Sequence, residues 1–392
     1  MPDSASPSTD VFDAGGRGMQ HHGLRRTNQK AVLTVVGFNW GVSNADISRF
    51  SGLAPQTVSA IVMELEQSGL VERGPVLRGR RGQPATPIFI RADGAFAIGV
   101  ELGWKHLDLV LLNMHAQVLA QRRQDYAFPR RDVVVDAIAR FAGELTEALP
   151  GTERARLQDI GVAMPGHLEH NLERLGASSA DVADWRDFDL SAELAARTGL
   201  VAHVFNDGNA ACWAELIALD RPRPTNILYF LISHFLAAGV IANGALWEGP
   251  TGNAANLGSM MVHDGSAGEL FAHDAASLSA LFARTGIAPG QLQSDNWVES
   301  DAAPQVRAWI EAGARVMSRV VFNTTTVIEA PLVVLDTVLA PSITRLFVER
   351  LTGELYALGV GNFTPPRIVP GRHGRLAPAI GAAELPLFRR YF

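Results

Sequence analysis

The sequence predicts an α/β protein in two parts: a small winged helix-turn-helix module and, after it, a much larger α/β domain. The length of 392 residues favours two parts, because it exceeds what one ordinary hydrophobic core accommodates. Residues 23–92 combine helical apolar spacings with a basic, glycine-rich hairpin, whereas strands and helices alternate from Phe96 onward. Residues 23–92 hold nine Arg and Lys against four Asp and Glu, and residues 93–392 hold 24 against 33. A basic module on an acidic body favours a polyanionic partner for the first part only.

The overall composition is typical of a globular protein, with 47% hydrophobic and 19% charged residues. No apolar run reaches the ~18 to 20 residues that a membrane-spanning helix needs, so no membrane association is expected. Residues 1–22 are rich in Ser, Pro, Gly and Asp and lack the apolar core of a signal peptide, which predicts a disordered tail. Cys212 is the only cysteine, which excludes an intramolecular disulfide and a cysteine-rich zinc site and favours a cytoplasmic location.

Two helices are predicted at the start of the module. Residues 24–40 carry apolar side chains at roughly helical spacing, which indicates the first helix. Ser43 precedes the second helix, and Asp46 lies three residues further on, in the position that completes a capping box. Ile47 and Phe50 are expected to form the buried face of this second helix. A tight turn then leads into a third helix.

The third helix is expected to begin with Pro55 at its first position, where the missing N–H costs nothing, and to end at Gly69. Ala54 is the candidate cap. Two short helices joined by a tight turn are typical of a helix-turn-helix, in which the first turn of the second helix faces base edges in the major groove. Polar side chains there can form hydrogen bonds with bases. The predicted base-contacting residues are Gln56, Thr57 and Ser59.

Two short strands are predicted around residues 70–71 and 88–90, with a basic tip between them. Arg78, Arg80 and Arg81 lie in this tip among glycines. Small residues allow the backbone to approach closely, and the arginines suit phosphates or a narrow minor groove. A small helical domain with a solvated basic hairpin is the alternative. The order of the elements, their spacing and their charge together favour a winged helix-turn-helix that binds double-stranded DNA.

The larger domain is expected to begin with successive strands over residues 96–126, with a hairpin turn around residues 113–117. Residues 132–149 have the spacing of an amphipathic helix. A further strand is expected over residues 159–167, and a second strand–helix unit begins at residue 201. This alternation predicts an α/β fold but says little about function.

Several blocks of the chain resemble the ROK family, a group of bacterial repressors and sugar kinases. The resemblance covers nearly the whole chain after residue 23, and it rests on the order and spacing of the blocks. It implies an actin-like, hexokinase-type fold with two lobes, at residues 96–204 and 205–378, and a C-terminal helix that returns to the first lobe. The blocks are the first helix with Asn28, the Arg/Gly wing, GVELG (99–103), GVAMPG (161–166), Trp185, FNDGNAA (205–211), AAGVIANGALWEG (237–249) and EAPLVVLD (329–336).

The resemblance also implies a polar ligand pocket. Asp207 matches the family's catalytic base and Asn206 its sugar-hydroxyl ligand, while Asn256 and Glu269 are candidates to complete the pocket. A carboxylate beside a sugar hydroxyl can act as a base or only as a hydrogen-bond acceptor, so its presence does not establish catalysis. Asn206 and Asp207 as caps of the following helix, and a vestigial cleft that binds nothing, are the alternatives.

The segments that hold nucleotide in the family's kinases are altered here. Trp104 stands at the second glycine of the first phosphate loop, Asp-x-Gly-Gly-Thr. Residues 233–237 correspond to the second loop, Gly-Thr-Gly-Ile-Gly, and contain no glycine; Asp336-Thr337 replaces a Gly-Gly on the adenosine side. Side chains at these positions obstruct the close backbone approach that phosphate requires. We therefore expect neither phosphotransfer nor a nucleotide cofactor, with Asp207 as a vestigial base.

The cysteine-bearing zinc segment of the family is also missing. His263, Asp264 and His273 remain nearby, but without the family's spacing. We expect these three to be surface or loop residues and expect no metal site.

The expected function is that of a transcriptional regulator, a repressor of carbohydrate-related genes, controlled by a sugar or sugar derivative. A homodimer or homotetramer would place two recognition helices about one DNA turn apart on an inverted repeat. Two alternatives stay open. One is an active sugar kinase with a fused DNA-binding domain, which rests on Asp207; the other is a regulator controlled by a protein partner that docks on the acidic body.

Overall fold

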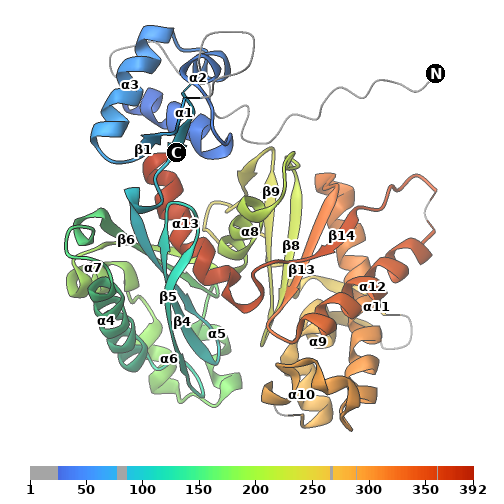
Figure 1. Cartoon of the computed structure of the whole chain (residues 1–392). Helices are drawn as coiled ribbons and strands as arrows, with labels where there is room; N and C mark the ends of the chain where they lie inside the picture. The colour runs from blue at the N-terminus through green and yellow to red at the C-terminus, as the bar shows by residue number, and fades with distance from the viewer. Residues whose placement is uncertain (1–24, 77–85, 265–267, 288, 360) are drawn as a thin grey trace, which may run out of the picture.

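An N-terminal module sits on a larger body of two β-sheets in the computed structural model (Figure 1). The predicted tail, residues 1–22, and the predicted wing residues Arg78, Arg80 and Arg81 lie outside the described residues. No helix in the described ranges is both long and apolar enough to traverse a lipid bilayer. The described ranges are 25–76, 86–264, 268–287, 289–359 and 361–392.

The described part of the N-terminal module consists of three helices and two antiparallel strands. Its capping box is confirmed, because Ser43 Oγ accepts the N–H of Asp46 at 3.3 Å and the Asp46 carboxylate accepts the N–H of Ser43 at 3.1 Å. Pro55 occupies the first position of the third helix, as expected, and Ala54 precedes it without a side-chain cap. The elements are α1 (Arg25–Phe38), α2 (Asn44–Ser51), α3 (Pro55–Gln67), β1 (Val71–Arg73) and β2 (Ile88–Ile90).

Phe50 is not part of the buried face of α2, and that prediction is wrong. Its side chain is 42% exposed and lies under the Arg49 guanidinium, 4.8 Å from the ring centroid. The buried positions of α2 are Ile47 and Ser51, which are four residues apart and therefore share one face of the helix. A helix of eight residues has only a narrow inward face, and Phe50 lies about 80° from the centre of that face.

The first lobe is built on a five-stranded mixed sheet. The predicted hairpin is present, because β4 and β5 pair antiparallel on either side of the turn at residues 114–117. Helices α4 (Arg131–Ala148) and α7 (Leu190–Thr198) pack against one another and against this sheet. The predicted lobe boundary at residue 205 falls inside β7, which belongs wholly to this sheet. The strand order is β5 (Val118–Asp125), β4 (His106–Asn113), β3 (Phe96–Leu102), β6 (Leu157–Met164) and β7 (Val201–Asn206).

The second lobe is built on another five-stranded sheet, and its central strands are buried on both faces. Leu228, Phe230 and Ile232 on β8 pack with the cluster of α11 and α12, whereas Tyr229 and Leu231 pack toward α8. The strand order is β10 (Ala245–Leu246), β9 (Leu236–Ala242), β8 (Ile227–Ile232), β13 (Leu332–Thr337) and β14 (Arg367–Pro370). The lobe's helices are α9 (Ala272–Ala276), α10 (Leu278–Thr285), α11 (Ala303–Ile328) and α12 (Pro341–Ala357), with a small hairpin of β11 (Met261–His263) and β12 (Glu269–Phe271).

Helices α8 (Asp207–Ala218) and α13 (Ala377–Tyr391) pack against each other between the two sheets (Figure 1). The C-terminal helix α13 lies against the first lobe, where it crosses β3, β6 and β4. This crossing is very close: a Cβ at Gly99 would lie 1.9 Å from the carbonyl oxygen of Ala379, and one at Gly381 would lie 1.8 Å from that of Ala210. Only glycine fits at these two positions.

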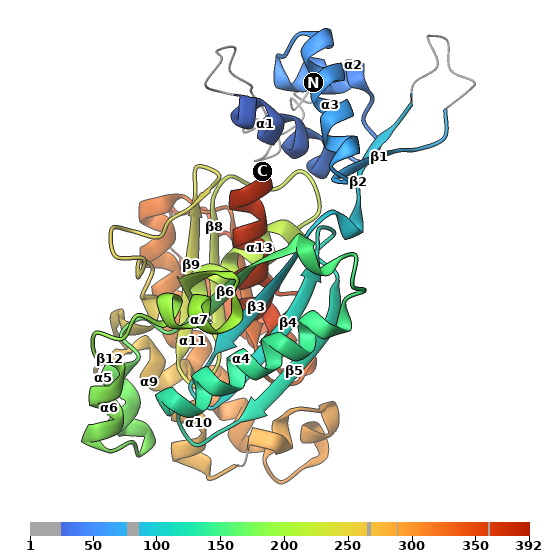
Figure 2. The same cartoon turned by 90° about the vertical axis from the view of Figure 1, so that its left-hand side faces the viewer.

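The far end of α13 reaches the N-terminal module (Figures 1 and 2). Phe392 lies so close to α1 that a Cβ at Gly37 would be 2.8 Å from its ring, and its ring meets that of Phe38 edge-on at 5.8 Å. From the second lobe, Arg221 donates to the carbonyl oxygen of Phe38 and to Asn39 Oδ1, both at 2.6 Å. The module is therefore joined to the body through α13 and through a loop of the second lobe.

Candidate functional site

The first turn of α3 presents the three predicted base-contacting residues. Its inward face is buried in the module's core, whereas Gln56, Thr57 and Ser59 are all exposed on the outward side. Asn44, at the start of α2, donates to Ser59 Oγ at 3.4 Å, so α2 helps to orient this side chain. The exposed polar turn and the tight α2–α3 turn have the geometry that a helix-turn-helix uses to enter the major groove.

A cavity of about 110 Å³ lies between the two lobes. It is much larger than the ~10 to 15 Å³ that a single water occupies, so it has room for a small polar molecule. Three of the four predicted ligand residues, Asn206, Asp207 and Asn256, line it. Glu269 does not, because it lies exposed on β12 and is not among the lining residues.

Asn206 and Asp207 line the cavity and also form the start of α8. Asn206 Oδ1 accepts the N–H of Asn209 at 3.1 Å, while its Nδ2 donates to Asn253 Oδ1 at 3.3 Å. Asp207 Oδ1 accepts the N–H of Gly208 at 2.8 Å. Capping and cavity lining, which were alternatives at the level of sequence, therefore coexist. Burial raises the pKa of Asp207 to about 6, and the Glu101 carboxylate adds to the rise.

The wall of the cavity on the second lobe includes a residue that the sequence did not reveal. Asn253 contacts Asn206, and a Cβ at Gly166 would lie 2.1 Å from Asn253 Oδ1, so this side chain closes against the first lobe. Nothing in its local sequence separates it from Asn256. Asn256 itself is exposed at the rim, where its Oδ1 accepts from Ser259 Oγ at 3.3 Å.

Two aromatic residues meet across one end of the cavity. Trp104 follows β3 in the first lobe and Phe235 precedes β9 in the second, and their rings are 4.9 Å apart and nearly perpendicular, at 87°. Both are almost completely buried. The Arg174 guanidinium lies 5.1 Å from the Phe235 centroid, on the same side of the cavity. Trp104 and Phe235 stand where the family's kinases were expected to have glycines, and their rings contact each other.

A group of buried ionisable residues lies on β3 and β4 of the first lobe. His106 Nε2 is 3.2 Å from Glu101 Oε1, and Asp108 Oδ1 accepts from Arg375 at 3.0 Å. Burial lowers the pKa of His106. The Glu101 and Asp108 carboxylates together raise it by more, so the pKa lies above its usual value. Because Asp108 also pairs with Arg123, the arginines offset much of the negative charge here.

Asp336 holds a loop of the second lobe. Its Oδ2 accepts the N–H of Gly374 at 2.8 Å, while Glu215 on α8 accepts the N–H groups of Arg372 and His373, both at 2.9 Å. Burial raises the pKa of Asp336 to about 7, and the neighbouring Glu215 carboxylate contributes. Asp336, which was predicted to replace a kinase glycine, therefore fixes the loop after β14.

The three residues near the missing zinc segment do not all lie on the surface. Asp264 lies outside the helices and strands, as a loop residue does, but it is buried and accepts from Arg315 Nε at 2.8 Å. His273 is half-buried and lines the cavity, 6.0 Å from the Phe235 ring. Burial lowers the pKa of His273. Only His263 is exposed among the three.

Two sugar-kinase-like lobes around a polar cavity, joined to a winged helix-turn-helix, define the class of protein. A family model described as the ROK family matches residues 97–387, and one described as the MarR family matches residues 22–82. The chain belongs to the ROK family and carries an N-terminal winged helix-turn-helix of the MarR type. The resemblance and the fold predicted from the sequence are both confirmed.

Curated relatives are similar to part of this chain. The xylose repressor of Bacillus spizizenii is 26% identical over 246 residues, which cover 61% of this chain and 61% of the relative. The DNA-binding transcriptional repressor Mlc of Escherichia coli is 23% identical over 246 residues, which cover 61% of this chain and 59% of the relative. The chain thus spans about three fifths of the length of these relatives.

Solved structures share the fold. The crystal structure of a ROK family transcriptional regulator, a homolog of the E. coli MLC protein, has a TM-score of 0.67 at 19% identity and covers 94% of this chain and 97% of its own. A ROK family glucokinase from Streptomyces griseus, in complex with glucose and AMPPNP, has a TM-score of 0.58 at 18% identity and covers 74% and 99%. At these identities the likeness concerns the fold alone.

Proposed function

We propose that this protein is a DNA-binding transcriptional repressor of carbohydrate-related genes, and that its interlobe cavity binds the effector, a sugar or sugar derivative. The observation that carries the proposal is that one chain joins an exposed polar turn on α3 to a polar cavity built on Asn206 and Asp207. The relatives described as repressors support the same assignment.

The DNA partner of this proposal is an inverted repeat, read by a homodimer or homotetramer. Two copies of α3 related by a two-fold axis would enter successive major grooves about one helical turn apart. The effector acts by favouring one arrangement of the lobes over another, since a ligand shifts an equilibrium only through its differential affinity for the two states. Helix α13, which packs on the first lobe and on the module, is the element through which that change reaches α3.

The proposal assigns no phosphotransfer and no nucleotide cofactor to the body. The contact between Trp104 and Phe235 supports this, because two buried rings occupy the side of the cavity where glycine loops would cradle phosphate. In this assignment Asp207 accepts a hydrogen bond from a sugar hydroxyl, and Asn206 and Asn253 orient the sugar.

A sugar kinase is the second candidate, and one observation favours it. Asp207 lines the cavity with a pKa of about 6, which suits a group that takes a proton from a hydroxyl near neutral pH. Turnover of ATP with magnesium and a sugar, lost in Asp207→Asn, would establish this candidate. A regulator controlled by a protein partner is the remaining candidate, and DNA binding that no sugar alters would favour it.

Thermal unfolding in the presence of ligands tests the proposal. A ligand that binds the folded protein raises the free energy of unfolding by RT ln(1 + [L]/Kd), which raises the unfolding midpoint. Even a ligand with a millimolar Kd therefore gives a measurable shift when its concentration exceeds Kd. D-xylose, D-glucose, N-acetyl-D-glucosamine and ATP with magnesium are the probes. We expect a rise with a sugar, no rise with ATP, and loss of the sugar effect in Asp207→Asn. Glu269→Gln is the matched control, because it replaces an exposed carboxylate outside the cavity.

A further inference from the structure

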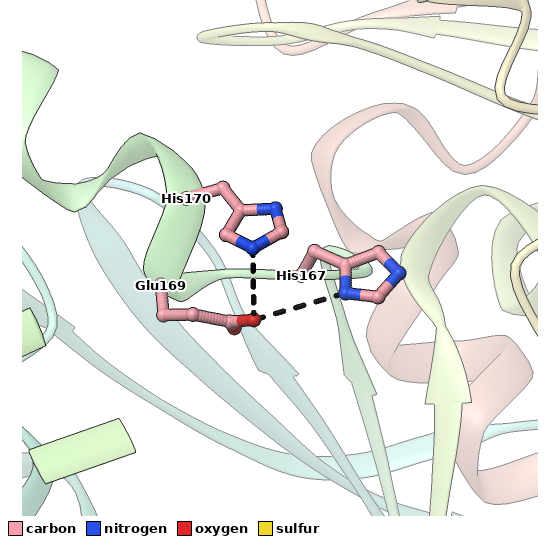
Figure 3. A group of neighbouring side chains, drawn as sticks. All are labelled: His167, Glu169 and His170. Carbon is pink, nitrogen blue, oxygen red and sulfur yellow. Dashed lines mark ion pairs between the residues drawn. The ribbon is translucent and has the colours of Figure 1, made fainter. Parts of the chain in front are cut away.

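Three side chains around the start of the short helix α5 (Glu169–Leu172) converge on one point (Figure 3). His167 Nδ1 lies 3.7 Å from Glu169 Oε1, and His170 Nε2 lies 3.6 Å from the same oxygen. One ligand atom from each of the three residues lies within 4.8 Å of the other two. Two imidazole nitrogens and a carboxylate oxygen are donors that zinc and similar divalent metals accept.

The spacing of these atoms is close to that of a metal site. Zinc binds histidine nitrogen at about 2.0 to 2.1 Å and carboxylate oxygen at about 2.0 to 2.2 Å, so neighbouring ligands of a tetrahedral ion are roughly 3.3 to 3.5 Å apart. The distances to Glu169 Oε1 exceed this range by only a few tenths of an ångström. The ligand atoms of His167 and His170 lie within 4.8 Å of each other, and both side chains must rotate about their χ angles to turn the lone pairs of the two nearly parallel rings toward one ion.

The backbone brings the two rings to the same side of Glu169. His167, two residues before α5 begins, adopts a left-handed conformation with φ of 53°, unusual for a residue other than glycine. Its ring and that of His170 are nearly parallel, at 7°, with centroids 5.2 Å apart. The histidine side chains are 62% and 70% exposed, so an ion can reach them directly from solvent.

We propose that His167, Glu169 and His170 form a binding site for Zn²⁺ or a divalent transition-metal ion of similar ligand preference, with water in the remaining coordination position. The site is separate from His263, Asp264 and His273, which lie on the second lobe. It lies on the first lobe, directly after Gly166, which lines the interlobe cavity. The proposal does not depend on what the cavity or the N-terminal module binds.

Equilibrium dialysis of the full-length, untagged protein against Zn²⁺ tests the site. We expect one Zn²⁺ per chain that His167→Ala and His170→Ala each remove, and whose affinity falls by more than roughly tenfold in Glu169→Gln, since even outer-shell partners of a metal contribute 10- to 100-fold. His263→Ala is the matched control, because it removes an exposed histidine elsewhere. A second control, His21→Ala with His22→Ala, removes the adjacent histidines of the N-terminal segment.

A Co²⁺ titration supplies a second readout. Tetrahedral Co²⁺ bound by nitrogen and oxygen absorbs visible light, and the band should be present in the wild type and both controls but absent in His170→Ala. Circular dichroism checks that each variant is folded. We expect all of them to fold, because the substituted histidines of the site are exposed. Zn²⁺ binding that survives in His167→Ala and His170→Ala, or that is lost equally in either control, would overturn the proposal.

Discussion

The ring of Trp104 meets the ring of Phe235 edge-on, 4.9 Å away, so that a residue of the first lobe touches a residue of the second. Edge-to-face pairs of this kind are worth about 0.5 to 1.5 kcal/mol beyond the apolar area that they bury. The contact forms only while the lobes are held at this separation. It is therefore a direct probe of lobe closure.

Breaking this contact should destabilise the body in a way that depends on both partners. We expect Trp104→Ala and Phe235→Ala each to lower the free energy of unfolding by about 3 to 5 kcal/mol, as for other large buried aromatic residues. The double variant should be less destabilised than the sum of the two, by about 0.5 to 1.5 kcal/mol. Urea unfolding of the four proteins measures this coupling. Phe271→Ala, at a 42% exposed position, is the control, and strict additivity of Trp104 and Phe235 would contradict the prediction.

The raised pKa of Asp207 should make stability depend on pH. An unfolded aspartate has a pKa of roughly 3.9, whereas the folded value is about 6. The folded state therefore binds the proton more tightly, so the contribution of Asp207 to stability is fully present below about pH 4 and is lost as the pH rises through about 6. Asp207→Asn should unfold at nearly the wild-type temperature at pH 4 and at a higher temperature at pH 8. A gap that does not change with pH, or that appears equally in Glu269→Gln, would count against this assignment.

The exposed residues of α3 should control sequence preference more than affinity. Gln56→Ala and Thr57→Ala are each expected to reduce discrimination between the operator and random DNA, by about 1 to 3 kcal/mol where the wild-type side chain forms a bidentate pair of hydrogen bonds with a base. Fluorescence anisotropy with both DNAs measures the difference. Gln67→Ala, at the opposite end of the same helix, is the control. Equal reductions in affinity for operator and random DNA would show that Gln56 and Thr57 do not read bases.

The predicted wing arginines should contribute binding that is independent of sequence. Arg80→Ala with Arg81→Ala is expected to weaken binding to operator and random DNA alike, because each arginine that neutralises a phosphate releases counterions. The dependence of log K on log salt should become shallower by up to roughly 0.9 for each arginine that neutralises a phosphate in the wild type. Binding isotherms across a salt series give this slope. An unchanged slope would remove the wing from the proposed interface.

The contact of Phe392 with α1 should carry the effector signal to the module. Phe392→Ala is expected to leave sugar affinity unchanged, since this residue is not among those lining the interlobe cavity. It should reduce the effect of sugar on DNA affinity, because it removes the ring that packs against Gly37 and Phe38. Titrations of DNA with and without sugar measure the coupling. Tyr356→Ala, on the exposed side of α12, is the control, and coupling that persists in Phe392→Ala would assign transmission to another contact.

Local chemistry explains what the sequence predicted well. The capping box of Ser43 and Asp46 and the position of Pro55 depend on neighbours within three or four residues, so a short stretch of sequence is enough to predict them. The order of strands and helices followed from periodicity and from the family resemblance. Asn206 and Asp207 were predicted because they match a motif of the family, and they lie where β7 ends and α8 begins.

The missed features depend on partners that are distant in sequence. Asp264 is buried because Arg315, 51 residues away, neutralises it, and no local pattern indicates that pair. Asn253 enters the cavity only because Gly166 on the other lobe lies against it. Glu269 was placed by matching a shortened segment to the family, and a two-stranded hairpin carries it out of the cavity instead.

One helix takes part in the packing of all three bodies. Leu385 on α13 packs with α8 and the second sheet, Ile380 packs with the first sheet, and Phe392 just beyond its end packs with the module's core. Opening any one of these interfaces leaves apolar surface of the same helix exposed to water, which penalises partial unfolding. The module and the two lobes therefore share one folding unit along α13, and local melting of the module is coupled to the stability of the whole chain.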